Sequence, residues 1–332
     1  MGDCVFRPAA RAVHRLATAC LAALALWGVS PSHAAWPERQ ITIVVPFPAG
    51  GLTDVAARHY AQGLQEELKQ PVVVENRVGA GGMIGTEFVA RAKPDGYTLL
   101  VNSPSHVINQ AFRSRMPYDA LRDFTPIAQL LSSPMVLVVH PSLPASDLKD
   151  YLALARAEKG GVSFGSTGTG GTSHLAGEML RLMTKAPMTH IPYKGANPAV
   201  NDLLGGQLPS IFLDVATVAQ HVGSGRLKAL AVSSAGRSDT LPQVPTVAEQ
   251  GYPGYDVSTW ISLYGPANLP ESMVRSLNAV AVRTMGSARE RDWLRQNGAA
   301  AGTLGPAEFR RFVQDELEKW TQFNQEARVK VD

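Results

Sequence analysis

The feature that most constrains the fold is a unit of strand, glycine turn and helix. Residues 40–46 read QITIVVP, a run of β-branched residues that is typical of a buried parallel strand. The turn FPAGGLTD follows at 47–54, and a helix is predicted over 54–69. Alternation of strands and helices in this way predicts an α/β fold with a largely parallel sheet.

The same unit recurs in the second half of the chain. The stretches KQPVVVENRVGAGGMIGTEFVARA and KAPMTHIPYKGANPAVNDLLGG share the order proline, strand, glycine loop, helix, although few residues are identical. Further strands are predicted at 72–75, 97–101, 161–165, 188–192 and 210–214, and further helices at 85–92, 174–184 and 199–204. The repeat predicts two similar α/β lobes that face each other, which is the layout of a hinged binding protein.

The chain is predicted to cross between these lobes twice. The apolar segment 125–140 makes the first crossing and 255–265 the return, and helices at 271–285, 288–297 and 306–324 are expected to pack on the first lobe. We therefore predict a first lobe of 35–136 and 256–332 and a second lobe of 137–255. A hinge of two crossings suits closure around a ligand.

The N-terminal segment indicates export. Arg7, Arg11 and Arg15 precede an apolar run at 16–29, and Ser32-His33-Ala34 supplies the small residues of a cleavage site. The run is shorter than the roughly 20 residues that a membrane-spanning helix needs. The sequence thus predicts a signal peptide over 1–34, cleaved near Ala34, and a periplasmic protein.

Composition excludes several classes of function. Both cysteines, Cys4 and Cys20, lie in the predicted signal peptide, so the mature chain can hold no disulfide and no cysteine-ligated metal. Without residues 1–34, 28 basic residues face 27 acidic ones, and a near-neutral chain is a poor candidate for nucleic acid. The histidines show no metal-ligand spacing. We expect no cofactor and no metal.

Two glycine-rich turns predict an anion site. At 47–54 and again at 166–173, a strand end, adjacent glycines and a helix start place backbone N–H groups around one point. Each helix end adds partial positive charge, worth about 0.3–1 kcal/mol when exposed and up to ~2 when partly buried. Two such ends facing one cleft would hold a carboxylate from both sides. We expect Asp54 to act as an N-cap that fixes the first turn.

Other polar residues follow strands whose carboxyl ends border the same cleft. Asn102 and Asp214 hold matching places in the two repeats, and Lys194 is a candidate cation for a second carboxylate. The predicted ligand-binding residues are Phe47, Ala49, Gly50, Gly51, Asp54, Asn102, Ser103, Ser105, Ser166, Thr167, Thr169, Gly170, Thr172, Tyr193, Lys194, Gly195, Asp214 and Ala216. His106 lies near the cleft in sequence, and Trp260 is either a wall of the site or a core residue.

A hydrolase is the competing enzyme hypothesis. Residues 161–165 match G-x-S-x-G around Ser163, but this serine falls within a predicted strand, whereas a nucleophile elbow needs it on a strand-to-helix turn. No phosphate-binding or dinucleotide-binding glycine pattern is complete. We therefore expect no catalysis.

Five stretches resemble one known family. ITIVVPFPAGGLTDVAAR, VVVENRVGAGGMIGTEFVARAKPDGYTLL, GSTGTGGTSHLAGEM, IPYKGANPAVNDLLGGQ and VPTVAEQGYPGY are similar to the substrate-binding proteins of tripartite tricarboxylate transporters, the Bug receptors. The resemblance covers essentially the whole predicted mature chain. It implies a type II-like Venus flytrap with two hinge crossings, and a carboxylate held by backbone groups and waters between loops that correspond to 47–54 and 166–172.

The resemblance also implies ligands and partners. The family's ligands are small carboxylates, and its receptors deliver them to membrane permease subunits. The alternative is a sensory adaptor that passes ligand occupancy to a membrane partner such as a sensor kinase. The sequence leaves the carboxylate itself and the far end of the pocket open.

Overall fold

The computed structural model describes residues 36–327 and residue 329, and the predicted signal peptide lies outside these residues. All the elements below belong to one unit of the chain that begins at Arg39. None of the helices in the described residues is both long and apolar enough to cross a membrane.

The first sheet forms around a parallel core. Its parallel strands are β1 (Ile41–Val45), β2 (Val72–Asn76) and β3 (Thr98–Asn102), in the spatial order β2-β1-β3. The antiparallel strand β9 (Ser258–Pro266) pairs with β3, and the short β10 (Ala300–Ala301) pairs with the next strand, β4. The helices after its parallel strands are α2 (Leu52–Leu68), η1 (Ala80–Gly82), α3 (Met83–Ala90) and α4 (Ser105–Phe112). We call these elements the first lobe.

The second sheet has the same plan. It contains β5 (Val162–Ser166), β6 (Met188–Pro192), β7 (Ser210–Asp214) and β8 (Lys228–Val232). Its helices are α5 (Leu148–Ala157), α6 (Thr172–Thr184), α7 (Ala196–Leu204) and α8 (Val215–Gly223). The strand β5 pairs parallel with β6 and β7, as β1 does with β2 and β3. We call these elements the second lobe.

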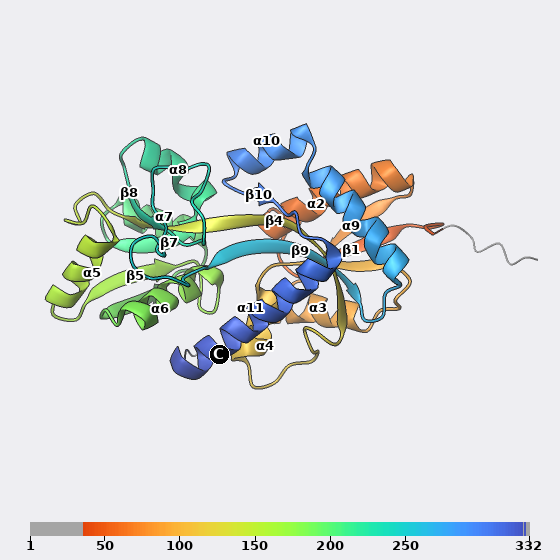
Figure 1. The fold of residues 1–332 in the computed structure, drawn as a ribbon, viewed down its shortest axis with the longest axis horizontal. Coiled ribbons are helices and arrows are strands. Elements are labelled where there is room, and N and C mark those ends of the chain that lie inside the picture. The colour runs from red at the N-terminus through yellow and green to blue at the C-terminus, as the bar shows by residue number, and fades with distance from the viewer. Residues whose placement is uncertain (1–35, 328, 330–332) are drawn as a thin grey trace, which may run out of the picture. The chain divides into compact units, whose positions relative to one another are not determined.

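One long strand joins the two sheets. The strand β4 (Phe124–Val139) pairs with β9 as far as Pro134, and from Met135 onward it pairs with β7 and then β8. Figure 1 shows β4 running from the yellow-green elements to the orange ones beside β9. The sequence predicted a crossing here but not a continuous strand of 16 residues.

The predicted repeat is visible in the backbone of the two β-turn-α units. Gly50 (φ +84) and Gly170 (φ +76) take the same left-handed conformation, which glycine adopts without steric cost. Each next glycine, Gly51 or Gly171, is the N-cap residue of its helix. The C-cap residues of α2 and α6 are Lys69 and Lys185, with φ of 54° and 53°. The two lobes thus present their glycine turns in the same way.

The C-terminal helices are α9 (Glu271–Met285), α10 (Ala288–Gln296) and α11 (Pro306–Ala327). Helix α11 buries Trp320 and Phe323 against Phe112 of α4, and each aromatic side chain so buried contributes roughly 1.5–3 kcal/mol. We expected these helices to pack on the first lobe, but α11 also contacts α6 of the second lobe. The reason is its length of 22 residues, since a helix rises about 1.5 Å per residue.

Candidate ligand-binding site

The first loop, residues 46–51, is held in shape by hydrogen bonds to the carboxylate of Asp54. Asp54 Oδ2 accepts from the Gly50 N–H at 2.9 Å, and Asp54 Oδ1 accepts from Asn76 Nδ2 at 2.9 Å. Asn76 also donates to the Phe47 carbonyl at 3.0 Å, so both ends of the loop are tied to the end of β2. The residues Pro48, Ala49, Gly50 and Gly51 are exposed at its tip.

The carboxylate of Asp54 is ionised, and the guanidinium of Arg58 compensates its negative charge. Arg58 Nε and Nη2 donate to its two oxygens at 2.9 and 3.0 Å, while the carboxylate itself is only 2% exposed. Hydrogen bonding from Arg58, then from Gly50 and Asn76, lowers the pKa of Asp54 to about 2 against the opposing effect of burial. Asp54 fixes the turn as expected, but its N-cap assignment is wrong. Gly51 is the N-cap residue, and Asp54 is the third residue of the helix.

The first N–H groups of α2 and α6 carry no side-chain cap. Among the other described helices, Asp147 and Ser287 cap α5 and α10 by accepting from Asp150 and Glu290 N–H groups, whereas α3, α4, α7, α8 and α9 also have no side-chain cap. Because the first turn of a helix has no intrahelical partner for its N–H groups, both glycine turns retain donors for an external acceptor. A carboxylate is the acceptor that these donors and the helix dipole favour most.

The second loop, residues 166–171, is held in shape by contacts with two histidines, His174 and His190. His174 Nδ1 accepts from the Gly170 N–H at 3.0 Å, and its ring stacks on His190 with 3.8 Å between the ring centroids. His190 Nε2 lies 2.6 Å from Ser166 Oγ, which also accepts from the Gly168 N–H at 3.2 Å. Burial is the main reason that the pKa of each histidine falls to about 4. The loop therefore rests on two neutral rings.

The last residue of β3 and the residues that follow it form a compact polar cluster. Asn102 is 1% exposed; its Oδ1 accepts from the Ser103 N–H at 2.8 Å and from Ser105 Oγ at 3.1 Å, while its Nδ2 donates to Thr86 Oγ1. The hydroxyl of Ser103 also contacts that of Ser105 at 3.1 Å. The cluster fixes the start of α4, with Ser103 and Ser105 only partly buried.

Asp214 is the last residue of β7, as Asn102 is the last residue of β3. It accepts from Thr259 Oγ1 on β9 at 3.1 Å, and its backbone pairs with Met135, so it lies where β4 passes between the sheets. Burial raises the pKa of Asp214 to about 6, which the Thr259 hydrogen bond opposes. Ala216, two residues on, is exposed.

In the loop after β6, Tyr193 and Gly195 form hydrogen bonds, whereas the side chain of Lys194 is exposed. The Tyr193 hydroxyl donates to Asp202 Oδ2 at 2.9 Å, and the Gly195 N–H donates to the Thr167 carbonyl at 3.2 Å, which ties this loop to the second glycine turn. Lys194 is exposed, as is Thr169, while Thr167 and Thr172 are partly buried. The loop after β6 therefore lies against the second glycine turn.

Three residues weighed in the sequence are structural. His106 is fully buried, with Nε2 2.9 Å from the Ala120 carbonyl and its ring stacked on Tyr264. Trp260 is 1% exposed and donates to Glu316, so it belongs to the core. Ser163 lies inside β5, in register with Thr189 of β6, and so is not on a nucleophile elbow.

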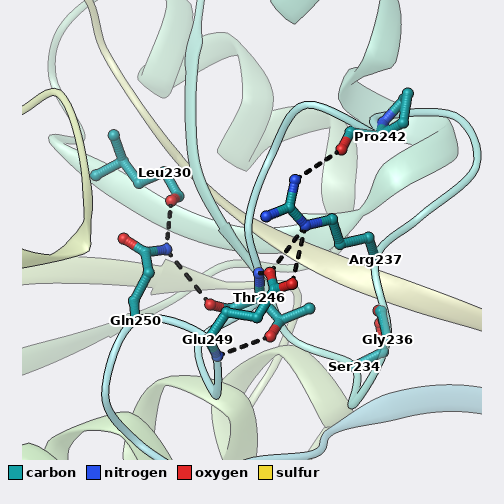
Figure 2. Close-up of polar contacts among 8 residues, drawn as sticks. All are labelled: Leu230, Ser234, Gly236, Arg237, Pro242, Thr246, Glu249 and Gln250. Carbon is teal, nitrogen blue, oxygen red and sulfur yellow. Dashed lines mark hydrogen bonds and ion pairs between the residues drawn. The ribbon is translucent and has the colours of Figure 1, made fainter.

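The segment VPTVAEQGYPGY also has a structural role (Figure 2). The Thr246 N–H donates to Glu249 Oε2 at 2.7 Å and the Glu249 N–H donates to Thr246 Oγ1 at 3.0 Å, a reciprocal capping box. Arg237 Nε donates to both Glu249 oxygens, and Gln250 Nε2 donates to the Leu230 carbonyl of β8 at 2.9 Å. This network fastens the end of the second lobe to its sheet before the chain enters β9.

Sequence reasoning missed the residues that support the loops from elsewhere in the chain. Arg58, Asn76, His174 and His190 each contact a loop residue or the side chain that holds it. Asp54 and His174 both stand four residues after the left-handed glycine. That shared spacing is a signal by which His174 could have been found.

Solved structures define the class of protein to which this fold belongs. The periplasmic binding protein BugD matches with a TM-score of 0.73 and 34% identity, over 89% of this chain and 99% of BugD. The chain therefore has the α/β fold of a two-lobed periplasmic solute-binding protein, as predicted. Among the described residues, no group of three or more histidine, aspartate or glutamate side chains is placed to hold a metal ion.

The family follows from the sequence match. Residues 56–329 match the family described as "Tripartite tricarboxylate transporter family receptor". BugT of Bordetella pertussis is 38% identical over 298 residues, which cover 89% of this chain and 91% of BugT. The chain belongs to the tripartite tricarboxylate transporter receptor family. The family is one of receptors, so the prediction that the chain is not an enzyme is confirmed.

Two solved relatives were obtained with dicarboxylates. Rpa4515 of R. palustris, solved with adipate, has a TM-score of 0.77 and 34% identity over 89% of this chain and 99% of its own. MatC (Rpa3494) of Rhodopseudomonas palustris, solved with bound malate, has a TM-score of 0.73 and 31% identity over 87% and 99%. Both relatives span nearly the whole of the described chain.

Proposed function

We propose that this receptor captures one small organic carboxylate, on the scale of three to six carbons, between the glycine turns of its two lobes. The observation that carries the proposal is the pair of uncapped helix starts, at Leu52 and Thr172, each behind a left-handed glycine. The adipate and malate of the solved relatives support the same class of ligand.

The energetics of such a site are adequate without a charged side chain at its centre. A hydrogen bond to a charged group contributes about 1.5–3 kcal/mol, and a partly buried helix end up to ~2. Micromolar affinity needs about 8 kcal/mol after the costs of association. Three or four amide or hydroxyl donors together with both helix ends give about 5–16 kcal/mol before those costs, and the upper part of this range permits micromolar affinity.

We place the ligand contacts at the predicted residues, divided by role. The exposed turn residues and the partly buried Ser103, Ser105 and Thr172 are proposed to face the ligand. Asp54, Ser166 and Asn102 are proposed to hold the turns, because their side chains already bond within their own lobe. Tyr193 is proposed to reach the ligand through its ring or backbone, since its hydroxyl is engaged by Asp202.

We also propose how the two lobes move. The lobes are assigned as 35–136 with 256–332 and as 137–255, turning about β4 and β9. Asp214 and Thr259 are bonded at this junction, which makes them the residues that a hinge rotation would strain first. Small-angle X-ray scattering with and without ligand should show a smaller radius of gyration when ligand is bound.

The proposed partner is the membrane permease of a tripartite transporter, and the proposed compartment is the periplasm. The family description names a transporter, which favours a permease over a sensor kinase. Mass spectrometry of the protein from a periplasmic extract should find an N-terminus near Ala35 if the predicted signal peptide is removed. An N-terminus at Met1 would contradict the proposed export.

A thermal-shift panel tests the proposed ligand class. Refolded protein, freed of any co-purified ligand, is heated with adipate, malate, succinate, citrate, glutamate and benzoate, and with neutral controls such as adipamide. A ligand at 100 times its dissociation constant adds about 2.7 kcal/mol of stability. We expect at least one carboxylate to raise the melting temperature and its amide to have no effect. A flat response to every acid would refute the proposal.

A further inference from the structure

The two glycine turns are supported by different side chains in the same position. Asp54 and His174 are each the third residue of their helix, and each accepts the N–H of the glycine four residues earlier, at 2.9 and 3.0 Å. The two glycines share the left-handed conformation described above. One support is a carboxylate and the other is an imidazole.

The hydrogen bonds fix the protonation of the second support. A backbone N–H can only donate, so Nδ1 of His174 must carry a lone pair where it meets Gly170. Its other nitrogen, Nε2, then carries the proton and lies 3.9 Å from Glu178 Oε1. A second proton on the ring would remove the acceptor and release the Gly170 N–H.

The surroundings of His174 oppose a positive charge. The side chain is 4% exposed, and His190 of β6 stacks on it. Ser166 Oγ of β5 accepts from the Gly168 N–H, donates to the Gly168 carbonyl at 3.2 Å and lies 2.6 Å from His190 Nε2. Burial lowers the pKa of His190 to about 4, so this ring is neutral near pH 7. On α6 itself, Glu178 is paired with Arg181 at 2.7 Å, so its charge is already compensated.

The side chains that hold the two glycine turns therefore carry no net charge in either lobe. In the first lobe the negative Asp54 is balanced by Arg58, and in the second lobe the two imidazoles are neutral. An anionic ligand would meet N–H donors backed by neutral supports in both halves.

We propose that His174 is a positioning residue of the ligand site, holding the second glycine turn through a neutral imidazole as Asp54 holds the first through a compensated carboxylate. The inference rests on the proposed function for its effect on affinity. The effect on the loop itself is independent of any ligand, because the Gly170–His174 bond lies within one lobe.

Three variants separate positioning from general stability. His174→Asn keeps an acceptor oxygen near the place of Nδ1, whereas His174→Leu fills the space without an acceptor. His140→Asn is the matched control, because His140 is a second-lobe histidine whose Nδ1, among the described residues, bonds to Ser142 two positions on and to no residue of a glycine turn. All three are first compared with wild type by circular dichroism and melting temperature.

The first measurement uses no ligand. Hydrogen exchange of the peptide covering 166–173 is expected to be at least tenfold faster in His174→Leu than in wild type, and within about threefold of wild type in His174→Asn. Equal exchange in wild type and His174→Leu would overturn the inference, whether or not any carboxylate binds.

The second measurement is the dissociation constant by calorimetry, with the acid that gives the largest thermal shift, from pH 8 to pH 5. We expect His174→Leu to bind about tenfold more weakly and His174→Asn within about threefold of wild type. The ratio of wild-type to His174→Asn affinity should stay constant across this range, since protonation of the ligand cancels in the ratio. A change in that ratio centred near pH 6.5, or equal losses in both variants, would overturn the inference. Failure of wild type to bind any acid would instead refute the proposed function.

Discussion

Replacement of Asp54 by alanine is the change that most directly links the first loop to both stability and binding. The substitution removes the acceptor of the Gly50 N–H, of Asn76 Nδ2 and of two Arg58 nitrogens. Arg58 is half exposed, and its pairing with Asp54 contributes little because water screens it. The Gly50 and Asn76 bonds to a buried charge carry most of the effect.

The magnitude can be worked out in two ways. Two hydrogen bonds to a charged group, at about 1.5–3 kcal/mol each and reduced for exposure of the donors, give a loss of about 2–4 kcal/mol in unfolding free energy. The pKa of Asp54 falls from 3.8 to about 2, which corresponds to at most about 2 kcal/mol, and the largest cause of that fall is the Arg58 contact that water screens. Because the folded-state pKa is lowered, this contribution is present above pH 4 and is lost as the pH falls toward 2.

The assay combines urea unfolding at pH 7 with calorimetric titration of the bound acid. We expect Asp54→Ala to remain folded, to lose about 2–4 kcal/mol and to bind about tenfold more weakly, because the Gly50 turn is released. Asp147→Ala is the control: Asp147 caps α5 by accepting from Asp150, so it should lose about 1 kcal/mol with no change in affinity. If Asp54→Ala loses stability but keeps full affinity, Asp54 lies outside the site and the reasoning fails.

Three further substitutions have expected outcomes. Gly50→Ala meets no atom within 4 Å but must adopt φ +84, so it should cost about 1 kcal/mol and weaken binding. Gly223→Ala, at the end of α8, also has open space but no positive φ, so in the same assays it should not lower stability and should leave affinity unchanged. Relative to wild type, Asp214→Asn should be more stable at pH 8 than at pH 4 by about 1–2 kcal/mol of unfolding free energy, measured by urea unfolding. Burial raises the pKa of Asp214 to about 6, so the stability that this carboxyl contributes in wild type is lost as the pH rises through that value. In wild type, burial lowers the pKa of His106 to about 4, so stability should fall between pH 6.5 and 4 as the unfolded chain takes up the proton first. In His106→Phe that fall should be smaller by up to about 3 kcal/mol, and an equal fall in both proteins would contradict the assignment.

The β-turn-α units could be predicted because their signals are local. Adjacent glycines after a β-branched run fix a turn whatever surrounds it, and strands such as β6 and β7 were predicted to the residue. The start of α2 was placed two residues late. Asp54 is a common N-cap residue type, and nothing local shows that Gly51 takes that position.

The remainder of the fold depends on contacts that no local pattern contains. Helix α4 has only eight residues and was not predicted. The strand β4 was predicted as a crossing segment, since its membership of two sheets depends on β7, β8 and β9, which lie far along the chain. The sequence predicted α11 over 306–324 but not its contact with α6 of the second lobe.

The supports of the loops were missed for the same reason. Asn76 is 22 residues from Asp54, and His190 is 24 residues from Ser166. Metal-ligand spacing is the pattern by which histidines are recognised in a sequence, whereas His174 accepts one backbone N–H, a role that leaves no such spacing. The chemistry of the turns was predictable, but the side chains that hold them in shape required the fold.

The central claim is that one carboxylate group is held between the turns at Gly50 and Gly170. A crystal structure of the protein with the acid that gives the largest thermal shift tests it most directly. We predict carboxylate oxygens within hydrogen-bond distance, directly or through one water, of backbone N–H groups from both turns. A carboxylate bound to only one lobe, or to side chains away from both turns, would contradict the account.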